Sequence, residues 1–256
     1  MSAFIPYCGA PPIPGHESWN LDPFLIGALA AGGAFLGWRI ARHAATPGWR
    51  LHAFGLGWLI LSLAFVSPLC NISVALFSAR AAQHILLTLC AAPLIAWGVA
   101  ALPQREKTVS TGSLSASVMA FAAILWFWHS PAPYDETLRN NLVYWLMHIS
   151  TAGAALGLWL ATFRSRAWPA FFAISATGLQ MSFLGALLTF ARAPLFSVHQ
   201  FTTAAWGLTW IGDQQLGGLL MWAPSGLLLT AYSIVGLALL LRRLDAPLSG
   251  GAAKPI

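Results

Sequence analysis

Residues 142 to 163 read LVYWLMHISTAGAALGLWLATF, an apolar stretch without a Lys, Arg, Asp or Glu. A helix needs about 20 apolar residues to cross the roughly 30 Å hydrocarbon core of a bilayer. Within lipid, every backbone N–H and C=O group must find its partner inside the protein, and an α-helix provides those partners. The stretch therefore predicts a transmembrane helix.

Six further apolar stretches of similar length lie on either side of it, and together they predict a bundle. They are Phe24–Ile40, Leu51–Leu69, Gln83–Leu102, Ser113–Trp128, Ala167–Phe190 and Leu216–Leu241. Pro93 and Pro224 fall inside two of these stretches, where we expect them to kink the helix without ending it. The expected fold is an all-α, polytopic membrane protein. A seven-transmembrane-helix bundle occupies residues 23–243, with tails at residues 1–22 and 244–256.

Composition agrees with a chain whose solvent is lipid. Hydrophobic residues make up 58% of the sequence and charged residues only 8%, whereas a soluble domain carries about a quarter charged residues. The mean hydropathy is +0.70. The net charge of +6 does not indicate nucleic-acid binding, because the basic residues lie in short loops between apolar stretches. No cleavable signal peptide is visible, since the first basic residue is Arg39.

The distribution of Lys and Arg predicts the orientation. One set of alternate loops holds ten: Arg39, Arg42, Arg50, Arg105, Lys107, Arg164, Arg166, Arg242, Arg243 and Lys254. The other set holds three: Arg80, Arg139 and Arg192. Basic residues are retained on the cytoplasmic side of a membrane. We therefore expect an extracytoplasmic N-terminal tail, residues 1–22, and a cytoplasmic C-terminal tail, residues 244–256.

Polar residues gather at the predicted outer ends of several helices. His84 opens the third helix, His129 follows the fourth, and His148 lies about two turns into the fifth. Asp213 leads into the seventh. A polar group at this depth is costly unless it is paired, hydrated or bound to metal.

A lone interfacial His is usually a hydrated polar group, but three on separate helices beside an Asp predict a metal or cofactor site. Imidazole suits copper and zinc, and the nearby sulfur atoms of Cys90 and Met147 suit Cu(I). We take His84, His129 and His148 as candidate ligands. Asp213 would be a carboxylate that orients an imidazole.

The two remaining cysteines allow two interpretations. Cys8 and Cys70 both fall on the predicted outer side. There they either form a disulfide, as an oxidising exterior permits, or remain free thiols.

Four stretches carry a resemblance to a known family. They are SARAAQHILLTLCAAPLIAWG from Ser78, WHSPAPYDETL from Trp128, LGALLTFARAPLF from Leu184 and DQQLGGLLMWAPSG from Asp213. The chain resembles the CtaG family of cytochrome c oxidase assembly factors, named for the caa-type oxidase. The last stretch is the most specific of the four.

The resemblance implies a seven-helix protein of the bacterial plasma (inner) membrane that helps to mature a haem–copper oxidase. It implies partners among the oxidase subunits, a role in supplying copper, and outer polar positions at His84, His129, His148 and Asp213. The sequence departs from the family pattern at two positions. Arg80 and Tyr144 stand where the family commonly has His, and a cation at position 80 repels copper.

Two classes of function fit these features. The first is a non-enzymatic assembly factor, because no nucleophile–base pair or carboxylate pair indicates catalysis. The second is a copper or small-solute membrane transporter, although the predicted inner halves of the helices carry almost no ionisable groups. A haem-binding membrane protein, with an outer His pair as ligands, is a third alternative.

The orientation is tested by fusions to the C-terminus. Because the basic loops predict a cytoplasmic C-terminus, a fluorescent protein fused there should be bright and alkaline phosphatase fused there should be inactive. Active phosphatase together with a dark fluorescent fusion would reverse the orientation.

Overall fold

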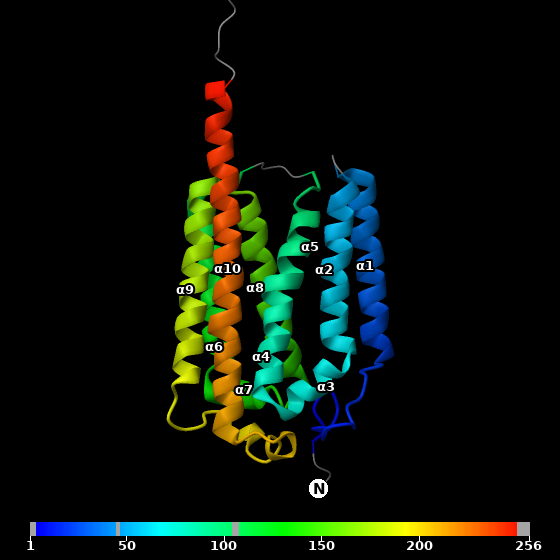
Figure 1. Cartoon of the computed structure of the whole chain (residues 1–256). Coiled ribbons are helices and arrows are strands. Elements are labelled where there is room, and N and C mark those ends of the chain that lie inside the picture. Colours follow the sequence, from blue (N-terminus) through cyan, green and yellow to red (C-terminus); the bar gives the residue numbers. More distant parts are fainter. Residues whose placement is uncertain (1–3, 45–46, 104–107, 250–256) are drawn as a thin grey trace, which may run out of the picture.

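The computed structural model describes residues 4–44, 47–103 and 108–249 and forms a helical bundle (Figure 1). The seven membrane-spanning helices predicted from the sequence are confirmed by their length and composition. Six of the spans are single helices: α1 (Pro23–His43), α2 (Pro47–Val66), α6 (Thr111–Trp128), α8 (Asn141–Phe163), α9 (Ala167–Thr189) and α10 (Trp210–Ser249). The remaining span joins α4 (Phe77–Ile85), the π-helix η1 (Leu86–Ala91) and α5 (Ala92–Val99).

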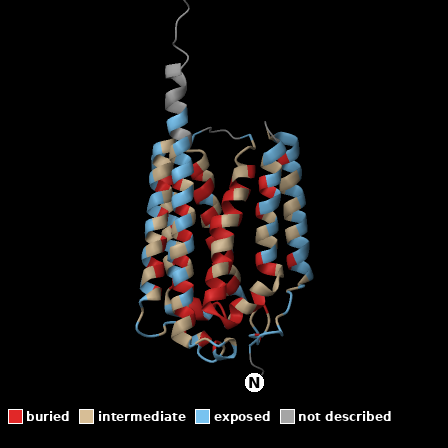
Figure 2. Cartoon of the chain, viewed as in Figure 1, coloured by how far each residue is buried: buried red, intermediate tan, exposed pale blue. Residues whose placement is uncertain are grey.

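The span of α4, η1 and α5 is the most buried of the seven spans. Figure 2 shows buried residues concentrated on it, while α1 is largely exposed. Its α4 segment packs against α3 and α10, and its α5 segment against α2 and α8. Side chains on this central span are therefore enclosed by protein on most sides.

Both prolines lie inside spans that continue past them, and neighbouring side chains replace the hydrogen bonds that they remove. Pro93 has no N–H for the Leu89 carbonyl, which instead accepts from the Tyr232 hydroxyl at 3.0 Å. Within η1 the Ala92 N–H donates to the Leu87 carbonyl, so the Thr88 carbonyl is free to accept from Trp159 Nε1 at 2.8 Å. These bonds fix the winding of the central span against α8 and α10.

Pro224 in α10 is compensated within its own helix. The Ser225 hydroxyl donates to the Leu220 carbonyl, the group that a residue-224 N–H would otherwise reach. The helix consequently continues through the proline to Ser249.

Short elements close the bundle at the end that carries the N-terminal tail, here called the N-terminal face (lower end in Figure 1). They are α3 (Pro68–Ala75), α7 (Pro131–Glu136) and the 3₁₀ turns Ser197–His199 and Ala204–Trp206. A disulfide joins Cys8 to Cys70, which decides between the two interpretations of this pair. Asn71 Nδ2 also donates to the carbonyls of Cys8 and Ala10, so the tail is bound to α3 by several links.

The helix α4 begins at Phe77, two turns earlier than the predicted start at Gln83. Leu76 precedes it and offers no side-chain cap. The carboxylate of Asp213 on α10 supplies that cap instead. It accepts from the Phe77 N–H at 2.6 Å, the Ser78 N–H at 3.1 Å and the Ser78 hydroxyl at 2.5 Å.

A glycine lets α10 come close enough for this contact. A Cβ placed on Gly217, one turn after Asp213, would overlap the Phe77 ring and lie 3.2 Å from the Ser78 Cα. Real side chains do not approach so closely, so only glycine fits at position 217. The close approach of α10 to α4 and the Asp213 cap therefore depend on each other.

The structure also differs from the sequence prediction at several helix ends. The last helix begins at Trp210 and not at Leu216, and it extends past the predicted boundary at Arg243. Arg80, assigned to an outer loop in the orientation count, lies inside α4 and is only 1% exposed. Arg105, Lys107 and Lys254 of that count, and residues 250–256 of the predicted tail, lie outside the described residues.

The cap makes a prediction about stability. Asp213→Asn keeps one acceptor oxygen but loses the charge, and removing a cap costs about 0.5–2 kcal/mol. A loss of 1 kcal/mol lowers the melting temperature of a chain of this size by about 2–4 °C. Thermal unfolding of the detergent-solubilised protein should show a shift of this order, larger for Asp213→Ala.

Glu136→Gln is the matched control, because this acidic side chain is exposed. It should melt with the unsubstituted protein. An unchanged melting temperature for Asp213→Asn would show that the carboxylate does not hold α4 and α10 together.

Candidate functional site

Three of the predicted site residues converge near the N-terminal face. His84 lies on α4, His129 is the C-cap of α6, and His148 lies on α8. The His84 ring is the middle one, with centroids 5.9 Å from His129 and 5.3 Å from His148. All three are almost fully buried. We call His84, His129 and His148 the imidazole cluster.

Backbone contacts fix the tautomers of two of these rings. His129 Nδ1 lies 2.7 Å from the Leu125 carbonyl, and His148 Nδ1 lies 3.0 Å from the Tyr144 carbonyl. A carbonyl only accepts, so each Nδ1 must carry the proton and each Nε2 keeps a lone pair. Metal-binding imidazoles are oriented in this way by a hydrogen bond from their other nitrogen.

Two Nε2 atoms of the cluster have no partner. Those of His84 and His148 are buried and make no hydrogen bond within the described part of the chain. Buried polar atoms are normally satisfied, so unpartnered ones mark a place that receives a ligand, ion or water. Burial also lowers the pKa of His129, which lies just beyond the end of its helix, to about 4, so this imidazole is neutral at physiological pH.

The fourth predicted residue, Asp213, is occupied elsewhere. Its two oxygens accept from the first turn of α4, as described above, and make no contact with an imidazole. Its effect on the cluster is through α4, which carries His84. Within the described residues, no group of three or more His, Cys, Asp or Glu side chains is placed so that it could hold a metal ion.

The two positions that depart from the family pattern lie beside the cluster. The Tyr144 ring packs 4.2 Å from the His148 ring, and its hydroxyl lies 3.2 Å from Cys8 Sγ. Arg80 is one turn before His84 on α4. Its guanidinium carbon lies 5.8 Å from the centroid of the Tyr144 ring. The cluster is thus bordered by a buried cation and a phenol.

Other polar residues near the N-terminal face have structural partners. His199 Nε2 lies 2.8 Å from the Tyr134 hydroxyl and His199 Nδ1 lies 3.2 Å from the Ala75 carbonyl, so neither ring nitrogen is free for a metal. Burial lowers the pKa of His199 to about 3. This histidine holds α7 to the end of α3.

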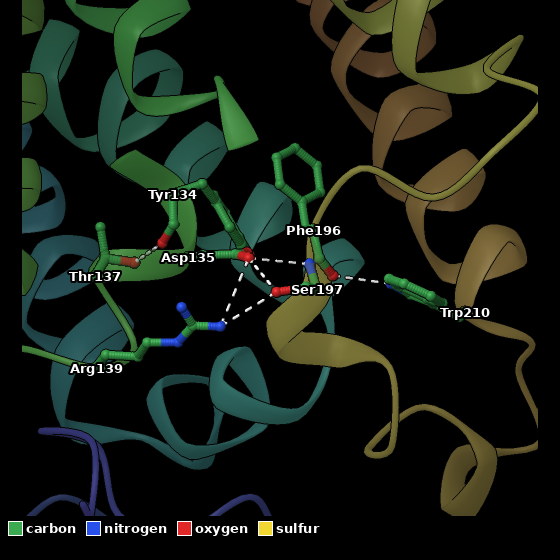
Figure 3. A network of polar contacts seen from close by, with 7 residues as sticks. All are labelled: Tyr134, Asp135, Thr137, Arg139, Phe196, Ser197 and Trp210. Atoms are coloured by element: carbon green, nitrogen blue, oxygen red, sulfur yellow. Dashed lines mark hydrogen bonds and ion pairs between the residues drawn. The ribbon is translucent and has the colours of Figure 1, made fainter. Parts of the chain in front are cut away.

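Asp135 performs a similar joining role (Figure 3). Its Oδ2 accepts from the N–H and the hydroxyl of Ser197, and Arg139 Nη2 lies 3.9 Å away. Trp210 Nε1 donates to the Phe196 carbonyl at 2.8 Å in the same network. These contacts hold α7 against the loop that leads to α10.

Sequence reasoning did not identify two polar side chains that also have unpartnered buried atoms. They are Gln83 Oε1 on α4 and Thr151 Oγ1 on α8. The available signal was the position of Thr151, which lies three residues after His148 and so on the same face of the helix. Gln83 is adjacent to His84 in the sequence, and adjacent side chains point in different directions, so its position gave no such signal.

A groove of about 450 Å³ leads from the side of the bundle toward the cluster. It runs between α1, α2 and α8, and its wall includes Phe65, Trp145 and His148. The Phe65 ring packs edge-to-face on the His148 ring, with centroids 5.1 Å apart.

The comparison with known protein families identifies one match. The family model described as cytochrome c oxidase caa3 assembly factor (Caa3_CtaG) matches residues 34–243, which include all three imidazoles and the Asp213 cap. No curated protein and no solved structure matches the chain. The match covers most of the sequence and all seven spans from the second half of α1 onward, so the chain belongs to the cytochrome c oxidase caa3 assembly factor family.

Proposed function

We propose that this protein binds copper transiently at the imidazole cluster and passes it to a haem–copper oxidase subunit in the bacterial plasma membrane. The observation that carries the proposal is the pair of buried, unpartnered Nε2 atoms of His84 and His148. Copper is cargo here, not a resident cofactor. Membership of an assembly-factor family suggests a non-catalytic role, which agrees with this.

The spacing of the rings fits a shared metal ion. A ring centroid lies about 3.2 Å from a metal bound at about 2.0 Å, so centroid distances of 5.3 and 5.9 Å correspond to ligand angles of about 110° and 135°. Such angles suit two or three ligands around one ion.

The chemistry of the ligands favours copper. Neutral imidazoles bind Cu(I), Cu(II) and Zn(II). Copper is the ion to propose among them, because the family is described by the assembly of a cytochrome c oxidase, which is a haem–copper enzyme. Asp213, the carboxylate predicted for the site, is engaged by α4 instead. A site built from neutral donors holds its ion less tightly than one with anionic donors, which suits temporary binding.

Two features support an outer location for the cluster. The basic loops predict that the N-terminal face is extracytoplasmic. The Cys8–Cys70 disulfide lies at this same face, and disulfides persist in oxidising compartments. Copper would therefore enter from the outer side.

The interior deeper than the cluster does not favour a transporter. Two polar groups there, the Trp159 indole and the Tyr232 hydroxyl, are bound to backbone carbonyls of the central span. Transport requires a succession of polar groups across the membrane. Haem binding between two cluster rings is also disfavoured, since edge-to-face contact at 5.3 Å leaves no room for a macrocycle.

Replacing cluster residues should reduce oxidase maturation. His84→Ala and His148→Ala should each lower copper retained by the purified protein at least about tenfold, because one of few ligands is lost. Oxidase activity in cells should fall while the abundance of the variant protein stays unchanged. Added copper should partly restore activity, since supply compensates for weakened binding by mass action.

His16→Ala provides the control, because His16 is exposed on the N-terminal tail. It should retain both copper and activity. If the cluster variants support full oxidase activity and added copper changes nothing, the protein acts by contact with the oxidase alone and the copper proposal is wrong.

A further inference from the structure

Arg80 is a buried cation whose hydrogen bonds are incomplete. Its side chain is 1% exposed. Nε donates to the Ser73 carbonyl at 3.3 Å and Nη1 donates to the Thr137 hydroxyl at 2.8 Å. Nη2 is buried and has no hydrogen-bond partner among the described residues. A buried charged group whose N–H donors lack hydrogen-bond acceptors carries a cost in free energy.

Aromatic rings provide part of the stabilisation. The guanidinium carbon lies 5.6 Å from the centroid of the Tyr134 ring and 5.8 Å from that of Tyr144. Such cation–π contacts offset some of the lost hydration. The face of an aromatic ring is a weaker hydrogen-bond acceptor than an anion or an oxygen atom, so the N–H groups of Nη2 still lack a strong acceptor.

No carboxylate pairs with Arg80 in the described part of the chain, where the single ion pair joins Arg139 to Asp135. The oxygens of Asp213 are bound to α4. Asp135 Oδ2 is bound to Ser197 (Figure 3), and Asp135 Oδ1, although unpartnered, is more than 4 Å from the Arg80 nitrogens. Arg80 thus has a free donor and no direct counterion.

Charge in this region becomes unfavourable once a metal ion enters. The positive charge of Arg80 and the negative charge of Asp213 offset each other at a distance, and the three imidazoles are neutral ligands. A copper ion in the cluster then adds at least one positive charge within about two helical turns of the guanidinium, in surroundings of low dielectric. An anion beside Arg80 removes this excess.

The available donors also limit the kind of anion. Carboxylates and phosphates prefer the two-nitrogen fork of arginine, and here Thr137 occupies one nitrogen of that fork. A single-atom acceptor needs only Nη2. We propose that Arg80 Nη2 binds a halide-sized monovalent anion and, resting on the proposed function, that copper is taken up together with this anion.

The anion site is tested first without metal. Chloride-35 NMR of the full-length protein in detergent should show line broadening that bromide competes away. Arg80→Gln should abolish the broadening and Arg80→Lys, which keeps the cation, should retain part of it. Arg139→Gln should leave it unchanged, because that arginine is exposed and not part of the site. Equal broadening in the unsubstituted protein and both Arg80 variants would overturn the proposal, and water would then satisfy Nη2.

Coupling between anion and copper binding is measured as the chloride affinity of the protein with and without copper. The copper affinity is not used, because halides also form complexes with free Cu(I). Chloride should bind at least about fivefold more tightly to protein loaded with one equivalent of Cu(I) than to metal-free protein, as linkage between two sites requires. His84→Ala should remove this difference. Chloride affinity that is the same with and without bound copper would overturn the coupling.

The two proposals fail in different ways. If Cu(I) does not bind to the purified protein, the proposed function is contradicted, and chloride binding by the metal-free protein still decides whether the anion site exists.

Discussion

The carboxylate of Asp213 at the start of α4 is the contact on which the arrangement of the site depends. The first N–H groups of a helix have no partner within it, and their buried position here leaves no access to water. Asp213 satisfies two of them from a different helix, 135 residues or more along the chain. Since α4 also carries Arg80 and His84, the position of both follows from this one joint between α10 and α4.

The number and approximate location of the spanning helices were predictable, because length and apolar composition alone determine what crosses a bilayer. The helix ends were not. Ser78 and Arg80 made the start of α4 resemble a polar loop, yet they are buried because Asp213 on α10 and Thr137 after α7 supply hydrogen-bond partners. Those partners are distant in sequence, so no local pattern identifies them.

The candidate site was also predictable only in part from the sequence. Convergence of His84, His129 and His148 followed from three helix ends at one membrane depth, and the structure brings the rings together. The role of Asp213 did not follow, since a residue at the start of one helix gave no sign that it caps another. The surroundings of Arg80 depend on Thr137, which belongs to the segment after α7, so they too required the fold.

The π-helical segment Leu86–Ala91 has a consequence for how the chain tolerates length changes. A π segment behaves as one extra residue wound into an α-helix. Each residue turns an α-helix by about 100°, so deleting one residue here and restoring regular winding would turn α4 by that amount relative to α5. His84 and Arg80 would then face a different neighbour while every residue outside the segment stayed the same. Insertions and deletions in these six positions therefore act as an angular adjustment of the site, and point substitutions there do not.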